Sequence, residues 1–200
     1  GVHFVFAPTP EEMYSPDEME QEFSFDFAGL DTVMEGKMRP GHFNGVVQVV
    51  SRLFELVRPT RAYFGEKDFQ QLAIIRHMVD QSSLAGQFEG LKIIGCPIVR
   101  EKSGLAMSSR NERLSENEKQ IAVGISKTLI SSVEWAKNTS VEDVKQRVID
   151  TINAIDGLEV EYYEIVDKTT LQPTNTFQNA IGCVTVYCGP VRLIDNIQYQ

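Results

Sequence analysis

The chain has 200 residues, of which 42% are hydrophobic and 24% are charged, and its formal net charge at pH 7 is −9. These values are typical of a chain that folds into one large domain or two small ones. No apolar stretch approaches the roughly 20 residues that span a bilayer, and no basic segment followed by an apolar one opens the chain. We therefore expect neither a membrane span nor a signal peptide.

The negative charge is concentrated at the start of the chain. Residues 1–35 hold nine carboxylates and no Lys or Arg, whereas the remaining 165 residues carry 19 acidic and 19 basic side chains. This imbalance argues against a nucleic-acid partner, because phosphate backbones are bound by cationic surfaces. A solvated acidic loop is the prediction for this segment, with a metal or partner site as the alternative, and the role of residues 9–35 stays open.

The three cysteines, Cys96, Cys183 and Cys188, show no pairing pattern. Their number is odd, no C-x-x-C spacing suggests zinc, and Cys183 and Cys188 should point to opposite faces of one strand. Free, buried thiols are expected in a reducing compartment, so we predict a cytoplasmic protein.

Periodic apolar residues over the first half of the chain predict alternating strands and helices. In chain order these are a buried strand at 2–6, an irregular polar segment at 9–22, a half-buried strand at 23–27, a helix at 42–57, a strand at 61–64, a helix at 67–79 and a strand at 91–94. Such alternation is typical of an α/β fold with a parallel sheet, which binds ligands at the carboxyl ends of its strands.

The second half has a different pattern. Ser115 and Glu118 form a capping box that opens a long helix reaching about residue 137, and Ser140 caps a second helix. Three strands follow, at 159–166, 182–188 and 191–197, and a tight Gly189-Pro190 turn joins the last two. Helices followed by antiparallel strands predict a separate small α+β unit. We therefore expect a domain boundary near Ile98, between residues 1–98 and 99–200.

The run Gly65-Glu66-Lys67-Asp68 lies where a predicted strand passes into a helix. Gly65 permits close approach of a ligand and a positive φ, the helix start offers free amides, and Lys67 supplies a point charge. Gln71 follows one turn beyond Lys67 on the same face. The alternative is a plain solvated helix start, but a lysine there opposes the helix dipole and so favours a phosphate site.

The run Met107-Ser108-Ser109-Arg110-Asn111 lies on a predicted exposed loop ahead of the next helix. Ser108 and Ser109 offer hydroxyl and amide donors, and the Arg110 guanidinium can bind two phosphate oxygens at once. A turn rich in Ser and Asn is the alternative. Because both runs lie at junctions between elements, together they predict two sides of one phosphate site.

The remaining polar candidates are weaker. His42 lies near a helix start, where a lone histidine is more often a structural hydrogen-bonding residue than a ligand-binding one. Ser108 and Ser109 have neither a G-x-S-x-G elbow nor an evident histidine base, so a hydrolase nucleophile is not expected.

Four strings of the sequence resemble those of the pantothenate synthetase (pantoate–β-alanine ligase) family. They are RPGHF at 39–43, RAYFGEKD at 61–68 followed by Gln70 and Gln71, GLAMSSRN at 104–111, and VRLIDN at 191–196. The resemblance spans essentially the whole chain. It implies a partial Rossmann-like parallel sheet with helices, followed by a small α+β lid domain that carries a three-stranded antiparallel sheet.

The resemblance also implies a reaction and its site. Pantoate would attack the α-phosphorus of ATP, and β-alanine would then attack the resulting pantoyl adenylate, with Mg²⁺ accompanying the ATP and a homodimer as the assembly. Lys67, Ser108, Ser109 and Arg110 would be catalytic, and Gln71 would bind pantoate. The ATP-binding residues would be Gly65, Glu66, Lys67, Asp68, Val99, Met107, Ser108, Ser109 and Arg110.

One departure from the family pattern concerns the histidines. The family carries an H-x-G-H signature upstream, whereas the three histidines of this chain are far apart. The chain thus resembles the downstream portion of the enzyme and is expected to be inactive or nearly so in isolation. Two alternatives remain, a nucleotidyltransferase with another substrate and a non-catalytic oligomerisation or regulatory module.

Overall fold

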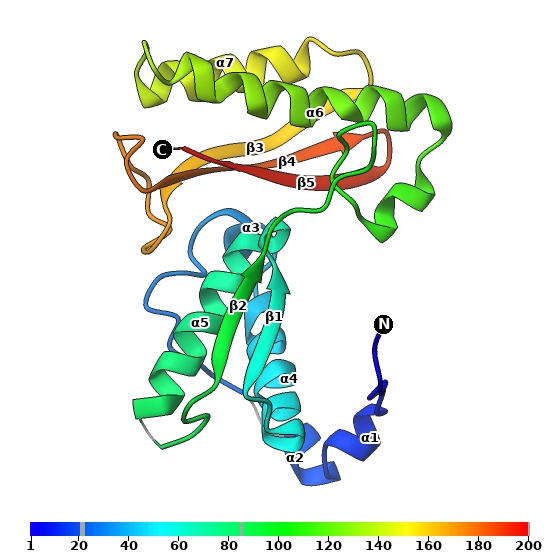
Figure 1. Ribbon diagram of the computed structural model, residues 1–200, viewed down its shortest axis with the longest axis vertical. Helices are drawn as coiled ribbons and strands as arrows, with labels where there is room; N and C mark the ends of the chain where they lie inside the picture. The colour runs from blue at the N-terminus through cyan, green and yellow to red at the C-terminus, as the bar shows by residue number, and fades with distance from the viewer. Residues whose placement is uncertain (21–22, 85, 200) are drawn as a thin grey trace.

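The structure is a computed structural model and describes residues 1–20, 23–84 and 86–199. A two-stranded sheet with its helices forms one part of the molecule, and a three-stranded sheet covered by two helices forms the other (Figure 1). The mixed α/β fold predicted from the sequence is confirmed.

The first part is built on a parallel pair of strands. β1 (Arg61–Gly65) pairs with β2 (Lys92–Cys96), and Gly65 lies opposite Cys96 at the carboxyl ends. The helix α4 (His42–Val57) has the bounds predicted from its apolar spacing, and Gly41 at its N-cap has a left-handed φ of 78°. Between β1 and α5 (Phe69–Leu84), the 3₁₀ turn η1 (Glu66–Asp68) occupies the predicted start of the second helix.

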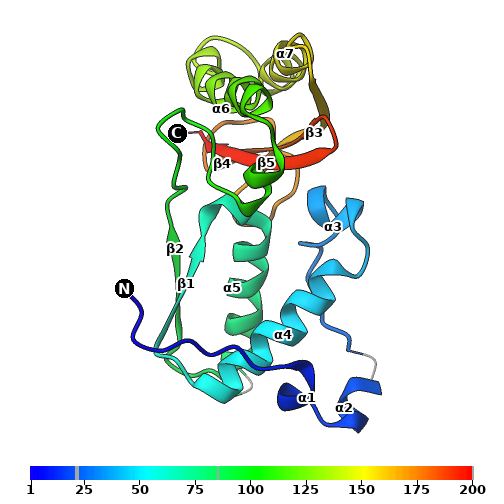
Figure 2. The same ribbon diagram turned by 90° about the vertical axis from the view of Figure 1, so that its right-hand side faces the viewer.

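The second part forms the predicted helix pair and antiparallel sheet. α6 (Glu116–Trp135) begins at the Ser115–Glu118 capping box, and α7 (Val141–Asn153) begins at Ser140. The sheet has the order β3 (Leu158–Asp167), β4 (Ala180–Cys188) and β5 (Val191–Gln198), all antiparallel. Figure 2 shows α6 and α7 nearly end-on above this sheet.

Two hydrophobic cores meet at β4, because successive side chains of a strand point to opposite faces. Val184, Val186 and Cys188 belong to the core beneath α6 and α7. Ile181 and Cys183 belong instead to the core that α4 and α5 form with the first sheet. The antiparallel sheet therefore packs on both faces, and its lower face lies against the first part of the chain.

The start of the chain differs from its prediction. Residues 2–6 form no strand, and Val2, Phe4 and Val5 are more than 80% exposed, so the predicted buried strand is wrong. Residues 23–27 keep the expected alternation of burial but pair with no described strand. The segment predicted to be irregular contains the short helices α1 (Pro10–Met13) and α2 (Pro16–Glu20), and α3 (Met34–Met38) follows.

Two further predictions from the sequence concern the cysteines and the absence of a membrane span. All three cysteines are free, with Cys183 and Cys188 buried, and burial raises the pKa of the Cys183 thiol to about 12. Across residues 1–20, 23–84 and 86–199, none of the helices is long and apolar enough to cross a membrane.

Candidate active site

A cavity of about 290 Å³ lies between the two parts of the molecule. Its walls come from the start of α4, the η1 turn with the start of α5, the 3₁₀ helix η2 (Ser109–Arg113), and strands β4 and β5. The η1 turn directly follows the carboxyl end of β1, which is where a parallel sheet is expected to bind ligands.

The Lys67 run is fixed against the second part through its backbone. The Asn196 side chain on β5 donates from Nδ2 to the carbonyl oxygens of Glu66, at 2.8 Å, and Lys67, at 3.0 Å. The Lys67 side chain is half-buried and lines the cavity, and Gln71 lines it one turn later. Gly65 has an extended φ of −70°, so the positive φ considered for it is wrong.

The Ser-Ser-Arg run forms a 3₁₀ helix rather than the loop predicted from its composition. Ser108 is the N-cap of η2, and its Oγ accepts from the Arg110 amide at 3.2 Å. Asn111 is buried and donates from Nδ2 to Glu101 Oε1 at 2.8 Å and to the Ala106 carbonyl at 3.0 Å. These local bonds give the serines a fixed place on the cavity wall.

The segment ahead of this run is tied to β5 by a two-pronged ion pair. The Arg100 guanidinium donates to both carboxylate oxygens of Asp195, at 2.7 and 3.0 Å, and Asp195 is only 5% exposed. Two parallel bonds of this kind fix orientation as well as distance. The turn that leads from β2 to η2 is therefore anchored at one wall of the cavity.

The structure brings most of the sequence-predicted site residues together. Six of them line the cavity, namely Lys67, Asp68, Gln71, Ser108, Ser109 and Arg110. Gly65, Glu66, Val99 and Met107 do not line it. Val99 and Met107 are joined by a backbone hydrogen bond of 2.9 Å, and their side chains are 65% and 55% exposed.

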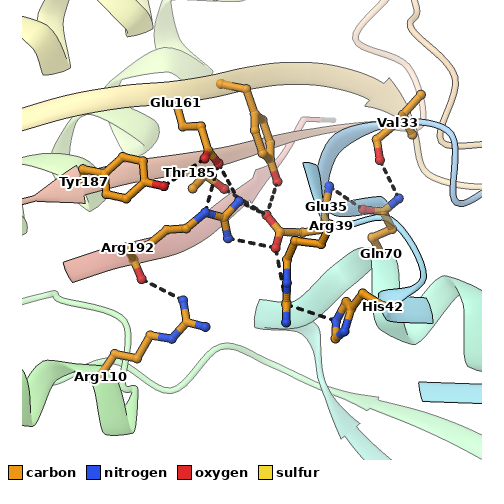
Figure 3. Close-up of polar contacts among 11 residues, drawn as sticks. Val33, Glu35, Arg39, His42, Gln70, Arg110, Glu161, Thr185, Tyr187 and Arg192 are labelled. Atoms are coloured by element: carbon orange, nitrogen blue, oxygen red, sulfur yellow. Dashed lines mark hydrogen bonds and ion pairs between the residues drawn. The ribbon is translucent and has the colours of Figure 1, made fainter. Parts of the chain in front are cut away.

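A largely buried group of charges lies beside these residues (Figure 3), and we call Glu35, Glu161 and Arg192 the charge cluster. Arg192 Nη1 and Nη2 donate to the two carboxylate oxygens of Glu35 at 2.9 and 2.6 Å, while Nε and Nη2 donate to Glu161 Oε2. The three side chains are between 14% and 17% exposed. Glu35 comes from α3, so the cluster joins the two parts of the molecule.

The Glu35 carboxylate also accepts hydrogen bonds from two hydroxyl groups of the sheet. Tyr162 donates to its Oε1 at 2.8 Å and Thr185 at 3.2 Å. Burial acts to raise the pKa of Glu35, but the bonds from Arg192 and Tyr162 outweigh it and hold that pKa below its ordinary value. Glu35 is therefore ionised at neutral pH, and it is not the solvated acidic residue that the sequence predicted.

Arg39 and His42 line the cavity together with Glu35, and the three side chains lie close to one another (Figure 3). Arg39 Nη1 is 3.1 Å from His42 Nε2 and 3.8 Å from a Glu35 oxygen, and 44% of the Arg39 side chain is exposed. Partial burial, together with the nearby positive charge of Arg39, lowers the pKa of His42. His42 is therefore neutral at pH 7, and Arg39 is a cation that faces the cavity.

Comparison with known proteins shows the family to which the chain belongs. The sequence profile of the family described as pantoate-beta-alanine ligase matches residues 1–198. This chain belongs to that family. Among its relatives, the pantothenate synthetase of Phocaeicola vulgatus is 57% identical to it, and the aligned segment covers the whole chain and 70% of that protein.

Solved structures of the pantoate–β-alanine ligase family have the same fold. The crystal structure of pantothenate synthetase from Thermus thermophilus superposes with a TM-score of 0.89 at 38% identity, covering all of this chain and 71% of that one. The ligase from Francisella tularensis, complexed with beta-gamma ATP and β-alanine, has a TM-score of 0.68 at 31% identity, covering 94% of this chain and 61% of that one. The activity of the family is the ligation of pantoate to β-alanine.

Several cavity residues of this ligase family member were not assigned by sequence reasoning. They are Glu35, Arg39, Tyr162, Arg192, Asp195 and Asn196. The strings 39–43 and 191–196 carried four of them as part of the resemblance, without a role. Glu35 gave no signal, because its partner Arg192 is 157 residues away.

No described group of three or more His, Cys, Asp or Glu side chains could hold a metal ion. The polar wall of the cavity instead offers cations, hydroxyl groups and amides. Donors of this kind suit phosphate and carboxylate oxygens, and both occur in the substrates of an acid–amine ligase that uses ATP.

Proposed function

We propose that this cavity binds ATP and pantoate side by side and ligates pantoate to β-alanine through pantoyl adenylate. The observation that supports it most directly is the meeting of Lys67 and Gln71 with Ser109 and Arg110 in one cavity, although the two runs come from different parts of the fold. A phosphate site with cations and hydroxyl donors on both sides suits a triphosphate.

In this proposal the nucleotide lies along the η1 turn and the η2 helix. Lys67 and Arg110, with the hydroxyl groups of Ser108 and Ser109, bind the phosphate oxygens, and Gly65, Glu66 and Asp68 border them. The exposed side chains of Val99 and Met107, held together by their backbone bond, offer apolar surface to the flat base. Gln71, which carries both a donor and an acceptor, binds pantoate.

The chemistry follows in two displacements. A carboxylate oxygen of pantoate attacks the α-phosphorus of ATP, and the bond to the β-phosphate oxygen breaks, so pyrophosphate leaves with the electron pair. The amine of β-alanine then attacks the acyl carbon, the bond from that carbon to the AMP oxygen breaks, and the amine loses a proton. Lys67 and Arg110 stabilise the charge that builds up on the departing pyrophosphate.

Magnesium would enter with ATP. Mg²⁺ is commonly bound by one or two carboxylates together with substrate phosphates, and Asp68 supplies an exposed carboxylate on the cavity wall. When bound, the ion would neutralise phosphate charge. Lys67 and the serine hydroxyl groups would still position the phosphoryl oxygens.

Three broader predictions from the sequence belong to this proposal. Residues 1–98 form the nucleotide-binding domain, and residues 99–200 form a lid that carries the Ser-Ser-Arg run toward ATP. The native assembly is a homodimer in the cytoplasm. Limited proteolysis near Ile98 and light scattering on the native-length protein test the division and the assembly.

The decisive assay uses the protein at its native length with ATP, Mg²⁺, pantoate and β-alanine. We expect equal amounts of AMP and pantothenate. Without β-alanine, we expect exchange of labelled pyrophosphate into ATP that requires pantoate. Release of ADP, or exchange that another acid supports better than pantoate does, would contradict the adenylate route or the substrate assignment.

A further inference from the structure

The second substrate brings a charge that the cavity must accommodate. β-Alanine attacks through its amine, and its carboxylate takes no part in the reaction and stays ionised throughout. A carboxylate that moves from water into a partly closed cavity needs a cationic or strongly hydrogen-bonding partner. The question is which cation of the cavity is free to take it.

Four cationic side chains line the described part of the cavity: Arg39, Lys67, Arg110 and Arg192. In the proposed function, Lys67 and Arg110 are engaged by the phosphates of ATP. All three nitrogens of Arg192 already donate to Glu35 or Glu161, and these two carboxylates offset its positive charge. By elimination, Arg39 is the one of these four that can receive a further anion.

The contacts of Arg39 agree with this conclusion. Its hydrogen bond to His42 and its ion pair with Glu35 both use Nη1, and the distance to Glu35 is as long as 3.8 Å. An arginine has five N–H donors in a planar fork, so the edge formed by Nε and Nη2 is available for a carboxylate. The Arg39 side chain as a whole is 44% exposed.

The backbone around Arg39 fixes the base of the side chain. Arg39 is the C-cap of α3, and its amide donates to the Glu35 carbonyl at 2.9 Å. The Arg39 carbonyl accepts from the His42 amide at 3.1 Å, which closes a turn through Pro40 and Gly41 into α4. Gln70, next in sequence to the proposed pantoate ligand Gln71, holds the start of α3, so the backbone that carries Arg39 is anchored to the helix that carries Gln71.

We infer that Arg39 binds the carboxylate of β-alanine and so orients its amine toward the acyl carbon of the adenylate. This inference rests on the proposed function, since it assigns a subsite within the same cavity. Pantoate is a poorer candidate for the Arg39 contact, because its carboxylate becomes an uncharged acyl group once the adenylate has formed. Arg39 is thus a binding residue for the second step only.

The test separates the two steps with Arg39→Gln in the native-length protein. We expect the KM for β-alanine to rise about 30-fold, as for the loss of a charge-assisted hydrogen bond. Pantoate-dependent exchange of pyrophosphate into ATP should stay within about twofold of the unsubstituted protein, as for a group that contributes no binding to the first step. Trapping of the adenylate with hydroxylamine, an amine without a carboxylate, should be equally unaffected.

Two further variants complete the design. Arg39→Lys keeps the charge but not the fork, so its KM for β-alanine should lie between those of the other two proteins. Arg61→Gln is the matched control, because Arg61 is exposed at the start of β1, at the opposite end of that strand from the η1 turn. It should leave all three measurements unchanged.

An unchanged KM for β-alanine in Arg39→Gln would overturn the subsite, and so would a parallel fall in exchange and hydroxamate formation. Absence of exchange in the unsubstituted protein would instead overturn the proposed function, and the subsite with it.

Discussion

The cavity contains two sets of charged side chains that differ in how they are held. The charge cluster of Glu35, Glu161 and Arg192 is largely buried, and its charges are paired within the protein. The open cations, Arg39, Lys67 and Arg110, are more exposed, and neither Lys67 nor Arg110 forms an ion pair with a described residue. The closely paired side chains of the charge cluster stabilise the architecture, whereas the open cations keep N–H donors that are available to ligands.

The largest expected effect tests the buried set. Arg192→Met leaves Glu161 without a cation and Glu35 with only its 3.8 Å ion pair to Arg39, so the free energy of unfolding should fall by about 3 kcal/mol, as for other broken ion pairs that are largely buried. Urea denaturation gives this value, provided that the slope with urea concentration is unchanged. Arg113→Met, at an exposed arginine of η2, is the control. A fall in the free energy of unfolding of less than about 1 kcal/mol would mean that the cluster stabilises the protein no more than an exposed ion pair does.

The next effect tests the open set. Lys67→Ala should slow adenylate formation by about 100-fold or more, because a preorganised positive charge is lost where negative charge develops. Its free energy of unfolding should change by less than about 0.5 kcal/mol. Single-turnover kinetics and denaturation measure the two quantities, with Lys92→Ala, at the exposed start of β2, as the control. If Lys67→Ala formed the adenylate at the rate of the unsubstituted protein, the proposed role of Lys67 would be wrong.

A third prediction concerns pH. The pKa of Glu35 is lower in the folded protein than in the unfolded chain, so its contribution to stability is complete above about pH 5 and is lost as the pH falls through the folded-state value. Glu35→Gln cannot titrate and should be about 2 kcal/mol less stable at pH 7, as for a lost hydrogen bond to a charged group. The difference between the two proteins should shrink below pH 4. A constant difference from pH 7 to pH 3 would contradict the assignment.

The smallest expected effect concerns a hydroxyl group that lies on the cavity wall with the open cations. Ser109 is exposed on the cavity wall, and no described side chain accepts from its hydroxyl group. Ser109→Ala should raise the KM for ATP by about fivefold, as for one neutral hydrogen bond, and should leave stability unchanged. Steady-state kinetics at saturating pantoate and β-alanine check this. A lower free energy of unfolding with an unchanged KM for ATP would show that Ser109 has a structural role rather than a binding one.

The same distinction explains how much the sequence predicted. α4, α6 and α7 begin at or within a residue of their predicted starts, because caps and apolar spacing are local signals. The two runs predicted to form a phosphate site were singled out for the same reason, since each lies at a junction between elements. Lys67 and Ser109 could therefore be placed on one cavity before any coordinates.

Other features depend on partners far away in the chain or outside it. Residues 2–6 have the apolar pattern of a buried strand, but a strand needs a neighbour to pair with, and none is found in the part of the chain that the structure describes. Glu35 looks like one more acidic residue until the fold brings it to Arg192. Long-range pairing of single side chains leaves no periodic trace in a sequence.

The carbonyl oxygen of Arg192 accepts a hydrogen bond from Arg110 Nη1 at 2.9 Å, while the Arg192 side chain belongs to the charge cluster. The first contact belongs to the main chain, so any amino acid at position 192 would preserve it as long as β5 stays aligned with β4. The side chain at position 192 can therefore change, and alter the contact between the two parts of the molecule, without moving the Arg110 guanidinium that we propose binds ATP. A random library at this position should accordingly separate thermal tolerance from ATP affinity.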